Sequence, residues 1–373
     1  MTLIYNGVTI PQVKGALIYN SVQLTKLIYS GVTVWEVPST IQSLSQVRDK
    51  LAGAFAENYA LFGGGTSYAY PYSAVVDAYN KSLTRSLPTA LSVARFGLAA
   101  ASGTLQTLFA GGNSGNTGTG AAAVVDSYNA SLTRSLLTAL SVARDQLAGI
   151  STLNHGIFAG GCDSSNQVRN TVDAYDASQT RSLPTVLSVA RQWLACANIG
   201  FFAYALFAGG NTKTSASAVV DAYDTSLTRS LPTALSVARQ QLAGASVGNY
   251  ALFAGGVGFN TAAYNTVDAY NTSLTRSTPT ALSQARNDLT GVSVGNYALF
   301  VGGSSGVIVN TVDAYNASLT RSTPTALSVA RIRPAAAPAG LNGTYAIVAG
   351  GYTSPDEYLA TVDAYSDSLN RIS

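Results

Sequence analysis

The sequence predicts an all-β protein, a seven-bladed β-propeller of four-stranded antiparallel blades. A unit of 45 to 50 residues recurs seven times, and each unit contains several short apolar runs separated by turn residues. No segment keeps a helical period without interruption by Gly or Pro. Repeats of this length, with several strands in each, are typical of radial or stacked repeat architectures.

Three landmarks recur in every unit: an Arg that ends a Leu-Ser-Val-Ala-Arg-like stretch, a Gly-Gly, and the Asp of a Val-Asp-Ala-Tyr-like stretch. The Arg positions are Arg48, Arg95, Arg144, Arg191, Arg239, Arg286 and Arg331. The Gly-Gly pairs begin at Gly64, Gly111, Gly160, Gly209, Gly255, Gly302 and Gly350. The Asp positions are Asp77, Asp126, Asp173, Asp221, Asp268, Asp313 and Asp363.

Residues 286–331 illustrate the four strands of one unit. We expect strands at Asp288–Val294, Tyr297–Val301, Thr311–Tyr315 and Thr320–Leu327, because Gly, Asn, Ser and Pro bound each run. Their apolar residues do not alternate with polar ones, which suits a sheet packed between two others, as a propeller blade is.

The two ends of the chain predict how the ring closes. The last unit stops at Ser373, soon after Arg371, and so lacks the stretch that leads to the next Arg. Residues Ser39–Arg48 match that stretch before any first strand has appeared. We therefore expect Ile41–Leu44 to be the outer strand of the seventh blade and to remove an exposed sheet edge.

The repeat resembles the kelch repeat, through its Arg, its Gly-Gly and a Tyr about fifteen residues further on. The resemblance covers Ser39 to Ser373. Kelch units usually carry a Trp after the Tyr, whereas this chain has Thr84-Arg85-Ser86 and its equivalents there. The chain is thus similar to a divergent kelch propeller, which implies domains at residues 1–37 and 38–373.

Residues 1–37 contain three copies of a second, shorter pattern: 3–10 (LIYNGVTI), 17–24 (LIYNSVQL) and 27–34 (LIYSGVTV). Each copy predicts two short strands joined at Asn-Gly, Asn-Ser or Ser-Gly. The pattern resembles a short repeat at the start of phage and prophage tail-associated proteins. That resemblance implies a module that docks the propeller onto other virion proteins, and the alternative is a small cap that packs on the propeller.

Composition argues against several function classes. Net charge is +3, and 14 of the 16 Arg occupy two fixed repeat positions, so no clustered basic face is expected for nucleic acid. The start of the chain has no signal-peptide pattern, and no apolar run is long enough to insert into a membrane. Cys162 and Cys196 stand at unrelated repeat positions and are expected to be free thiols.

The sequence offers no catalytic or metal-binding constellation. His155 is the only histidine, and the singular residues Cys162, Cys196, Glu57 and Glu357 are scattered over different units. We therefore expect no catalytic residues, no metal site, no cofactor and no enzymatic activity.

The recurring Asp and Arg are expected to form seven structural pairs, each Asp with an Arg of its own or the adjacent blade. A charged group among packed blades must be paired, because an unpaired buried charge is costly. The alternative is a ring of arginines that holds an anion in the central channel.

The copies differ from one another mainly in two places: the loop between the second and third strands, and the two residues after each Arg. Strand parity puts both on the same face of the ring, which we call the variable face. The turns of the opposite face vary less. Diversity on one face of a rigid scaffold suggests a recognition surface, and the alternative is drift in surface loops. The aromatic candidates for contact are Tyr68, Tyr70, Tyr72, Trp193, Phe259, Tyr352 and Tyr358.

These observations predict a non-enzymatic phage or prophage tail-associated protein. Residues 1–37 would bind other tail or virion proteins, and the variable face would contact a host-surface glycan or protein, richest in aromatic residues where the first and last blades meet. The alternatives are a structural or decoration protein without an external ligand and a kelch-like carbohydrate-active enzyme. The expected location is the virion, assembled in the host cytoplasm, and the sequence leaves homo-oligomer formation open.

Overall fold

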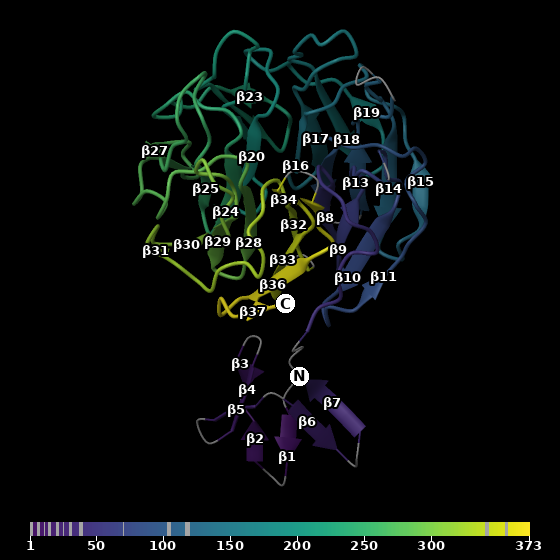
Figure 1. The fold of residues 1–373 in the computed structure, drawn as a ribbon, viewed down its shortest axis with the longest axis vertical. Helices are drawn as coiled ribbons and strands as arrows, with labels where there is room; N and C mark the ends of the chain where they lie inside the picture. The colour runs from purple at the N-terminus through teal and green to yellow at the C-terminus, as the bar shows by residue number, and fades with distance from the viewer. Residues whose placement is uncertain are drawn as a thin grey trace.

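Seven four-stranded antiparallel blades form a ring in the computed structural model, which confirms the predicted propeller (Figure 1). The structure describes residues 40–373 except 70, 103–105, 116–119, 340–342 and 355–356, and before residue 40 it describes the backbone of seven short strands. Those strands, β1–β7, lie beside the ring in Figure 1.

Each blade is a meander whose strands pair in chain order. The first strands, which line the centre, are β8 (Ala52–Ala56), β12 (Ala99–Ser102), β16 (Ala148–Ser151), β20 (Ala195–Ile199), β24 (Ala243–Val247), β28 (Thr290–Val294) and β32 (Ala335–Pro338). The second strands are β9 (Tyr59–Gly63), β13 (Gln106–Ala110), β17 (His155–Ala159), β21 (Tyr204–Ala208), β25 (Tyr250–Ala254), β29 (Tyr297–Val301) and β33 (Tyr345–Ala349).

The outer half of each blade is made of one longer and one very short strand. The third strands are β10 (Val76–Asn80), β14 (Val125–Asn129), β18 (Val172–Asp176), β22 (Val220–Asp224), β26 (Val267–Tyr270), β30 (Val312–Asn316) and β36 (Val362–Ser366). The fourth strands are β11 (Arg85–Ser86), β15 (Arg134–Leu136), β19 (Arg181–Ser182), β23 (Arg229–Ser230), β27 (Arg276–Ser277), β31 (Arg321–Ser322) and β37 (Arg371–Ile372). A small hairpin, β34 (Tyr352–Ser354) with β35 (Glu357–Tyr358), decorates the seventh blade.

The hydrophobic core lies between neighbouring blades. One cluster, for example, joins Leu206 and Ala222 of the fourth blade to Phe253 and Tyr270 of the fifth, all fully buried. Second and third strands are therefore covered on both faces, which is why their sequences show no alternation of apolar and polar residues.

The fourth strand is shorter than the sequence suggested. We expected Thr320–Leu327, and the structure has only Arg321–Ser322 paired with β30. Pro324 has no N–H to donate to a sheet. Leu327 donates its N–H to Asn310 O at 2.9 Å. The chain thus leaves the blade edge and crosses to the next blade as an irregular connection. The predicted start of the first strand at Asp288 is also wrong, because Asp288 has φ 53° and lies in a turn before Thr290.

The closure of the ring differs in the same way. Ile41–Leu44 forms no strand, and the fourth strand of the seventh blade is Arg371–Ile372. Residues 40–48 are instead the connection between the seventh and first blades. Leu44 N–H donates to Ala360 O at 2.8 Å, and Arg48 N–H donates to Leu359 O at 3.0 Å. Buried Leu44 packs in the cluster that joins those two blades. Residues 40–48 therefore lie beside the seventh blade, as expected. Their conformation is irregular because the fourth strand of that blade is completed by two other residues, Arg371 and Ile372.

The short N-terminal copies form the predicted strand pairs. β1 (Leu3–Tyr5) pairs with β2 (Val8–Ile10), β4 (Ala16–Tyr19) with β5 (Val22–Leu24), and β6 (Lys26–Tyr29) with β7 (Val32–Glu36). An additional strand, β3 (Gln12–Val13), pairs with β4. The predicted domain boundary at residue 37 lies outside the described residues.

Candidate functional site

The repeated residues hold one blade to the next. Arg191 ends the connection from the third blade, and its guanidinium enters the fourth blade. Its Nη2 donates to Asp221 Oδ2 at 2.8 Å and to Phe207 O at 3.0 Å. Asp221 also accepts the backbone N–H of Ser188 at 2.9 Å and the Ser188 hydroxyl at 3.2 Å. The carboxylate therefore fixes the incoming connection at two points.

Two more repeated side chains complete this arrangement. Arg229, about a quarter exposed, lies with Nη1 3.6 Å from Asp221 Oδ1. The buried Tyr223, two residues after the Asp, donates its hydroxyl to Thr185 O of the same connection at 2.7 Å. Burial raises the pKa of Tyr223, and Asp221 raises it further, so the hydroxyl stays a donor.

The seven expected Asp–Arg pairs are present, and both partners are at most 1% exposed in every pair. They are Arg48–Asp77, Arg95–Asp126, Arg144–Asp173, Arg191–Asp221, Arg239–Asp268, Arg286–Asp313 and Arg331–Asp363. Burial lowers the pKa of each of these arginines, and the partner Asp opposes that shift. A ring of arginines around an anion in the channel is therefore wrong, since these guanidinium groups are buried inside the blades.

The Gly-Gly of each blade contacts the end of the connection that leaves that blade. Gly64 has φ 72°, and a Cβ added there would come within 2.6 Å of Arg95 O. Gly65 N–H donates to that same carbonyl at 2.9 Å. The landmarks that define the repeat thus all make contacts within or between blades.

The variable face brings its two variable sets side by side, as strand parity predicts. In every blade, the first residue after the Arg forms an antiparallel bridge with the first residue of the loop between the second and third strands. The bridges are Asp49–Thr66, Phe96–Asn113, Asp145–Cys162, Gln192–Asn211, Gln240–Val257, Asn287–Ser304 and Ile332–Tyr352.

The second residue after each Arg forms a belt around the channel on the variable face. All seven belt residues have positive φ, between 49° and 62°. Six of them donate their N–H to the C=O of the belt residue in the preceding blade, at 2.9 to 3.3 Å. Lys50, the belt residue of the first blade, instead donates its N–H to Asp49 Oδ1 at 2.7 Å. The belt residues are Lys50, Gly97, Gln146, Trp193, Gln241, Asp288 and Arg333.

Aromatic rings gather where the first and last blades meet, which we call the seam. Tyr68 and Tyr358 lie with ring centroids 5.3 Å apart, and Tyr352 and Tyr358 with centroids 5.6 Å apart. The first and last loops are therefore neighbours, as the sequence predicts. Tyr68 is 67% exposed, whereas Tyr352 and Tyr358 are partly buried.

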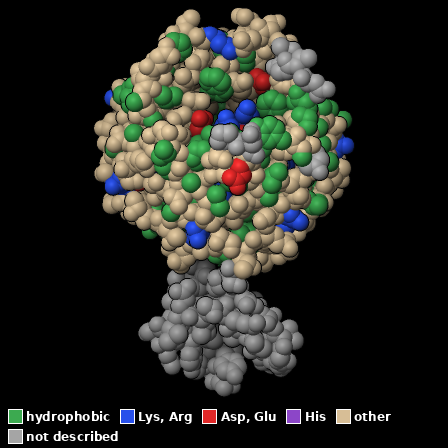
Figure 2. All heavy atoms as spheres, in the orientation of Figure 1, with side chains coloured by type: hydrophobic (Ala, Val, Ile, Leu, Met, Phe, Trp, Pro, Cys, Tyr) green, Lys and Arg blue, Asp and Glu red, His purple; other side chains and the backbone are tan. Residues whose placement is uncertain are grey.

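Charged groups lie beside these rings. Arg333 Nη2 lies 2.7 Å from Asp49 Oδ2, and the Arg333 guanidinium lies over the Tyr352 ring at 5.6 Å. Burial raises the pKa of the Asp49 carboxyl, and Arg333 opposes that shift. Burial also raises the pKa of Asp288 on the neighbouring belt position, again opposed by Arg333. In Figure 2, basic and acidic side chains lie near the centre of the face turned to the viewer.

The remaining predicted contact residues have different surroundings. Tyr70 lies outside the described residues. Tyr72 stacks on Phe96 with ring centroids 5.7 Å apart and donates its hydroxyl to Gly115 O. The Lys50 ammonium lies over the Phe96 ring, 5.2 Å from its centroid. Trp193 and Phe259 are 40% and 41% exposed and belong to the fourth and fifth blades, away from the seam in the order of the ring.

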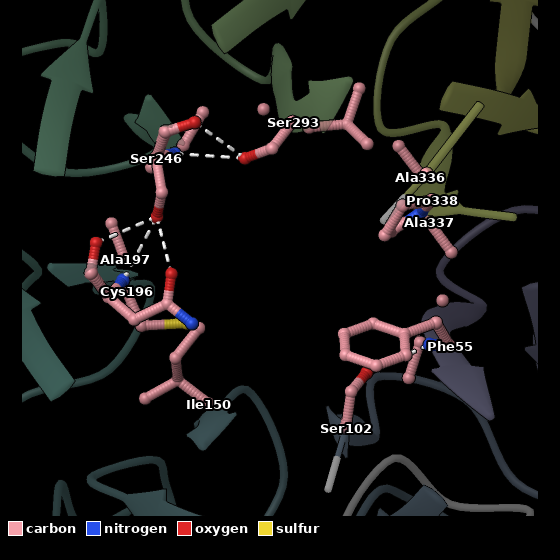
Figure 3. Close-up of a pocket in the computed structure, with 18 of the residues that line it drawn as sticks. Phe55, Ser102, Ile150, Cys196, Ala197, Ser246, Ser293, Ala336, Ala337 and Pro338 are labelled. Carbon is pink, nitrogen blue, oxygen red and sulfur yellow. Dashed lines mark hydrogen bonds between the residues drawn. The ribbon is translucent and has the colours of Figure 1, made fainter. Parts of the chain in front are cut away.

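The centre of the ring is a cavity of about 1090 Å³ lined by the seven first strands. Its wall consists mainly of small residues (Figure 3). Small residues are needed because adjacent first strands approach closely: a Cβ on Gly244 would come within 2.2 Å of Cys196 O. Serine hydroxyls bridge neighbouring blades here, and Ser293 Oγ donates to Ser246 O at 2.7 Å.

Sequence reasoning missed two groups of residues. Asp49, Lys50, Asp288 and Arg333 follow a repeated Arg, and the sequence indicates only that these positions vary, although their mixed charges set them apart. An aromatic group on the opposite face was also missed; its signal was the extra length of the turn at 200–203, between two otherwise repetitive strands.

Neither metal ligands nor a reactive thiol stand out among the residues that the structure describes. No group of three or more His, Cys, Asp or Glu side chains there could hold a metal ion. Cys162 and Cys196 are both free, and burial raises the pKa of Cys196 to about 12. In the same described ranges, no helix has the length and apolarity to cross a bilayer.

Comparison with known proteins supports the fold. No family model matches the chain, and neither does any curated protein. A solved structure titled "Structure of YjhT" is similar, with a TM-score of 0.60 and 13% sequence identity. The match covers 76% of this chain and 99% of that one. At this identity the likeness extends to the fold alone.

Proposed function

We propose that this chain is a non-enzymatic binding protein of a phage or prophage tail, which uses the seam of its variable face to contact a glycan or protein on the host surface. The propeller fold is consistent with a binding or structural role. Residues 1–37 would attach the propeller to other virion proteins, and the protein would be located in the virion.

The observation that carries the proposal is the combination of rings and charges at the seam. Tyr68, Tyr352 and Tyr358 form a continuous ring contact between the two loops, with Arg333 and Asp49 beside them. Aromatic residues supply contact area at low entropic cost, and a paired Arg and Asp can hydrogen-bond hydroxyl groups or peptide groups. The residues of the seam are not repeated in every blade. The repeated Arg, Asp and Gly-Gly are engaged in contacts between blades and connections, so a ligand contact would fall to non-repeated residues such as these.

A glycan array and a host-cell binding assay with the full chain test the proposal. We expect saturable binding to one class of host glycan or to intact host cells, and no release of a cleaved product. Binding to neither would favour a structural or decoration protein. Release of a sugar product would favour a carbohydrate-active enzyme and would contradict the non-enzymatic role.

A further inference from the structure

On the opposite face of the ring, at the mouth of the central cavity, the fourth and seventh blades have longer turns between their first and second strands than the other five blades. Between the first and second strands, the fourth blade has four residues, at 200–203, where the fifth blade has two, Gly248 and Asn249. The two extra positions allow consecutive phenylalanines, Phe201 and Phe202, and both line the cavity.

The backbone of this turn is strained. Phe201 has φ 53° and Phe202 has φ 68°. Positive φ is uncommon for a bulky residue and costs conformational energy. The turn is held by two hydrogen bonds: Ala203 N–H donates to Ile199 O, and Leu153 N–H of the third blade donates to Phe202 O, each at 2.9 Å. Strain of this kind is concentrated at ligand-binding and active sites.

The strained turn reaches a third phenylalanine in a distant blade. Phe202 lies with its ring centroid 6.4 Å from that of Phe55, in the first blade. Phe55 is itself an exception, because the equivalent residues of the first strands are Ser102, Ser151, Asn198, Ser246, Ser293 and Pro338. Figure 3 shows Phe55 projecting into the opening, opposite Ser246 and Cys196. Phe55 and the turn of the fourth blade therefore meet across the mouth.

The geometry of the three rings leaves apolar surface uncovered. The Phe55 and Phe202 rings are inclined by 56°, and the Phe201 and Phe202 rings by 79°, so they do not cover each other face to face. Phe55 is buried, at 8% exposed, whereas Phe201 is 68% exposed and the neighbouring Leu153 is 47% exposed. A further ring could stack on Phe201 and on the uncovered part of Phe202.

The chemistry of the wall selects the kind of ligand. Among the described residues that line the cavity, the only charged ones are Lys81 and Asp367. Several wall hydroxyls already bond within the wall: Ser246 Oγ donates to Asn198 O at 2.8 Å, and Ser102 Oγ accepts Phe55 N–H at 2.8 Å. The wall therefore offers apolar contact and little for a charged ligand to pair with.

We propose that the opposite-face mouth of the channel is a second binding site, which takes an uncharged aromatic ring on Phe201 and Phe202, with the buried Phe55 supporting Phe202 from below. The ring can belong to a free small molecule or to a side chain that a partner protein presents. This site is independent of the seam and does not rest on the proposed function.

Saturation-transfer NMR on the full chain tests this site with two uncharged probes. Indole represents the free molecule, and N-acetyl-tryptophan amide represents a ring carried on a peptide. We expect saturable transfer to at least one of them, and the probe with the tighter binding identifies the source of the ring.

Two variants on the opposite face should lose that binding. The first replaces Ile199–Ala203 by Val-Gly-Asn, the turn that the fifth blade already uses, and the second is Phe55→Ser, the residue of the second blade at this position. Because each loses aromatic contacts, the dissociation constant should rise about tenfold. Phe259→Ser, on the variable face, removes an exposed ring and should leave binding unchanged.

No saturable transfer to either probe in the unaltered chain would overturn the proposal. So would equal binding by the turn replacement, or loss of binding in Phe259→Ser alone. Melting temperatures of all variants separate a lost site from a lost fold.

Discussion

Arg191, which precedes the fourth blade in the chain, is paired with Asp221 on the third strand of that blade, at 2.8 Å and with both side chains 0% exposed. The pair therefore joins the connection to the blade that it enters. Since the same pairing recurs in all seven blades, its strength bears on the stability of the whole ring.

Asp221→Ala should destabilise the protein by roughly 3–5 kcal/mol, because it leaves the Arg191 guanidinium buried without its anion. Denaturant unfolding measures the loss. Asp224→Ala is the matched control: Asp224 caps an exposed turn by accepting the N–H of Ser226 and Thr228, and its loss should cost about 1 kcal/mol. Equal losses in the two variants would argue against a structural role for the buried pair.

Removal of residues 1–47 should destabilise the ring, whereas removal of residues 1–36 should leave it folded. The longer deletion takes away Leu44, which is 4% exposed, and Ser45, which donates its N–H to Asp77 Oδ1 at 2.9 Å. Loss of a buried Leu side chain alone costs about 2–5 kcal/mol. Thermal melts compare the two proteins, and the same melting temperature for both would contradict closure through residues 40–48.

His155→Tyr should make the protein more resistant to mild acid. Burial lowers the pKa of His155 below its usual 6.5, so the folded state disfavours the proton more than the unfolded state does. The stability that this group contributes is fully present above pH 6.5 and is lost as pH falls through the lowered pKa. Tyr is the residue of the fourth, fifth and sixth blades at this position.

Urea midpoints at pH 7.5 and pH 5 measure this effect. The unaltered protein should lose more stability between the two than the variant does, since all other titrating groups are shared. An identical pH dependence of the two midpoints would show that His155 is not held in its neutral form.

Tyr68→Ala combined with Tyr352→Ala should weaken host-cell or glycan binding without lowering the melting temperature. A central aromatic contact in an interface contributes about 2 kcal/mol or more, so the loss of even one of the two contacts should lower the affinity about thirtyfold. Phe259→Ala, in the fifth blade, is the control for loss of an exposed ring. Undiminished binding by the double variant, with binding lost on changing the opposite face, would overturn the assignment to the seam.

The number of blades could be predicted from the sequence because its evidence is redundant. Seven Gly-Gly pairs and seven Asp residues in phase leave one architecture. The prediction of a fourth strand at Thr320–Leu327 was wrong because apolar residues there suggested a strand. Leu327 is buried, but as part of an irregular connection between blades. Burial between blades has the same sequence signature as burial in a sheet.

The seam could be predicted only in outline. Adjacency of Tyr68 and Tyr358 follows from closure of a ring, whereas the pair of Arg333 with Asp49 depends on side-chain directions set by the turns after Arg331 and Arg48. The contact of Phe202 with Phe55 joins residues from blades that are not neighbours, and no repeat pattern encodes a contact that occurs once.

The irregular connections have a consequence for where the chain can be cut. Residues 40–48 reach the seventh blade without a peptide bond to it, yet they carry the same Arg, and make the same backbone contacts, as the six connections that are continuous with the preceding blade. The seven connections are therefore structurally equivalent, whether or not the chain is continuous through them. A circular permutant would join Ser373 to Thr40 and open the chain at another connection. It would retain every Asp–Arg pair between a connection and the blade that it enters, and its two ends would lie between a different pair of blades.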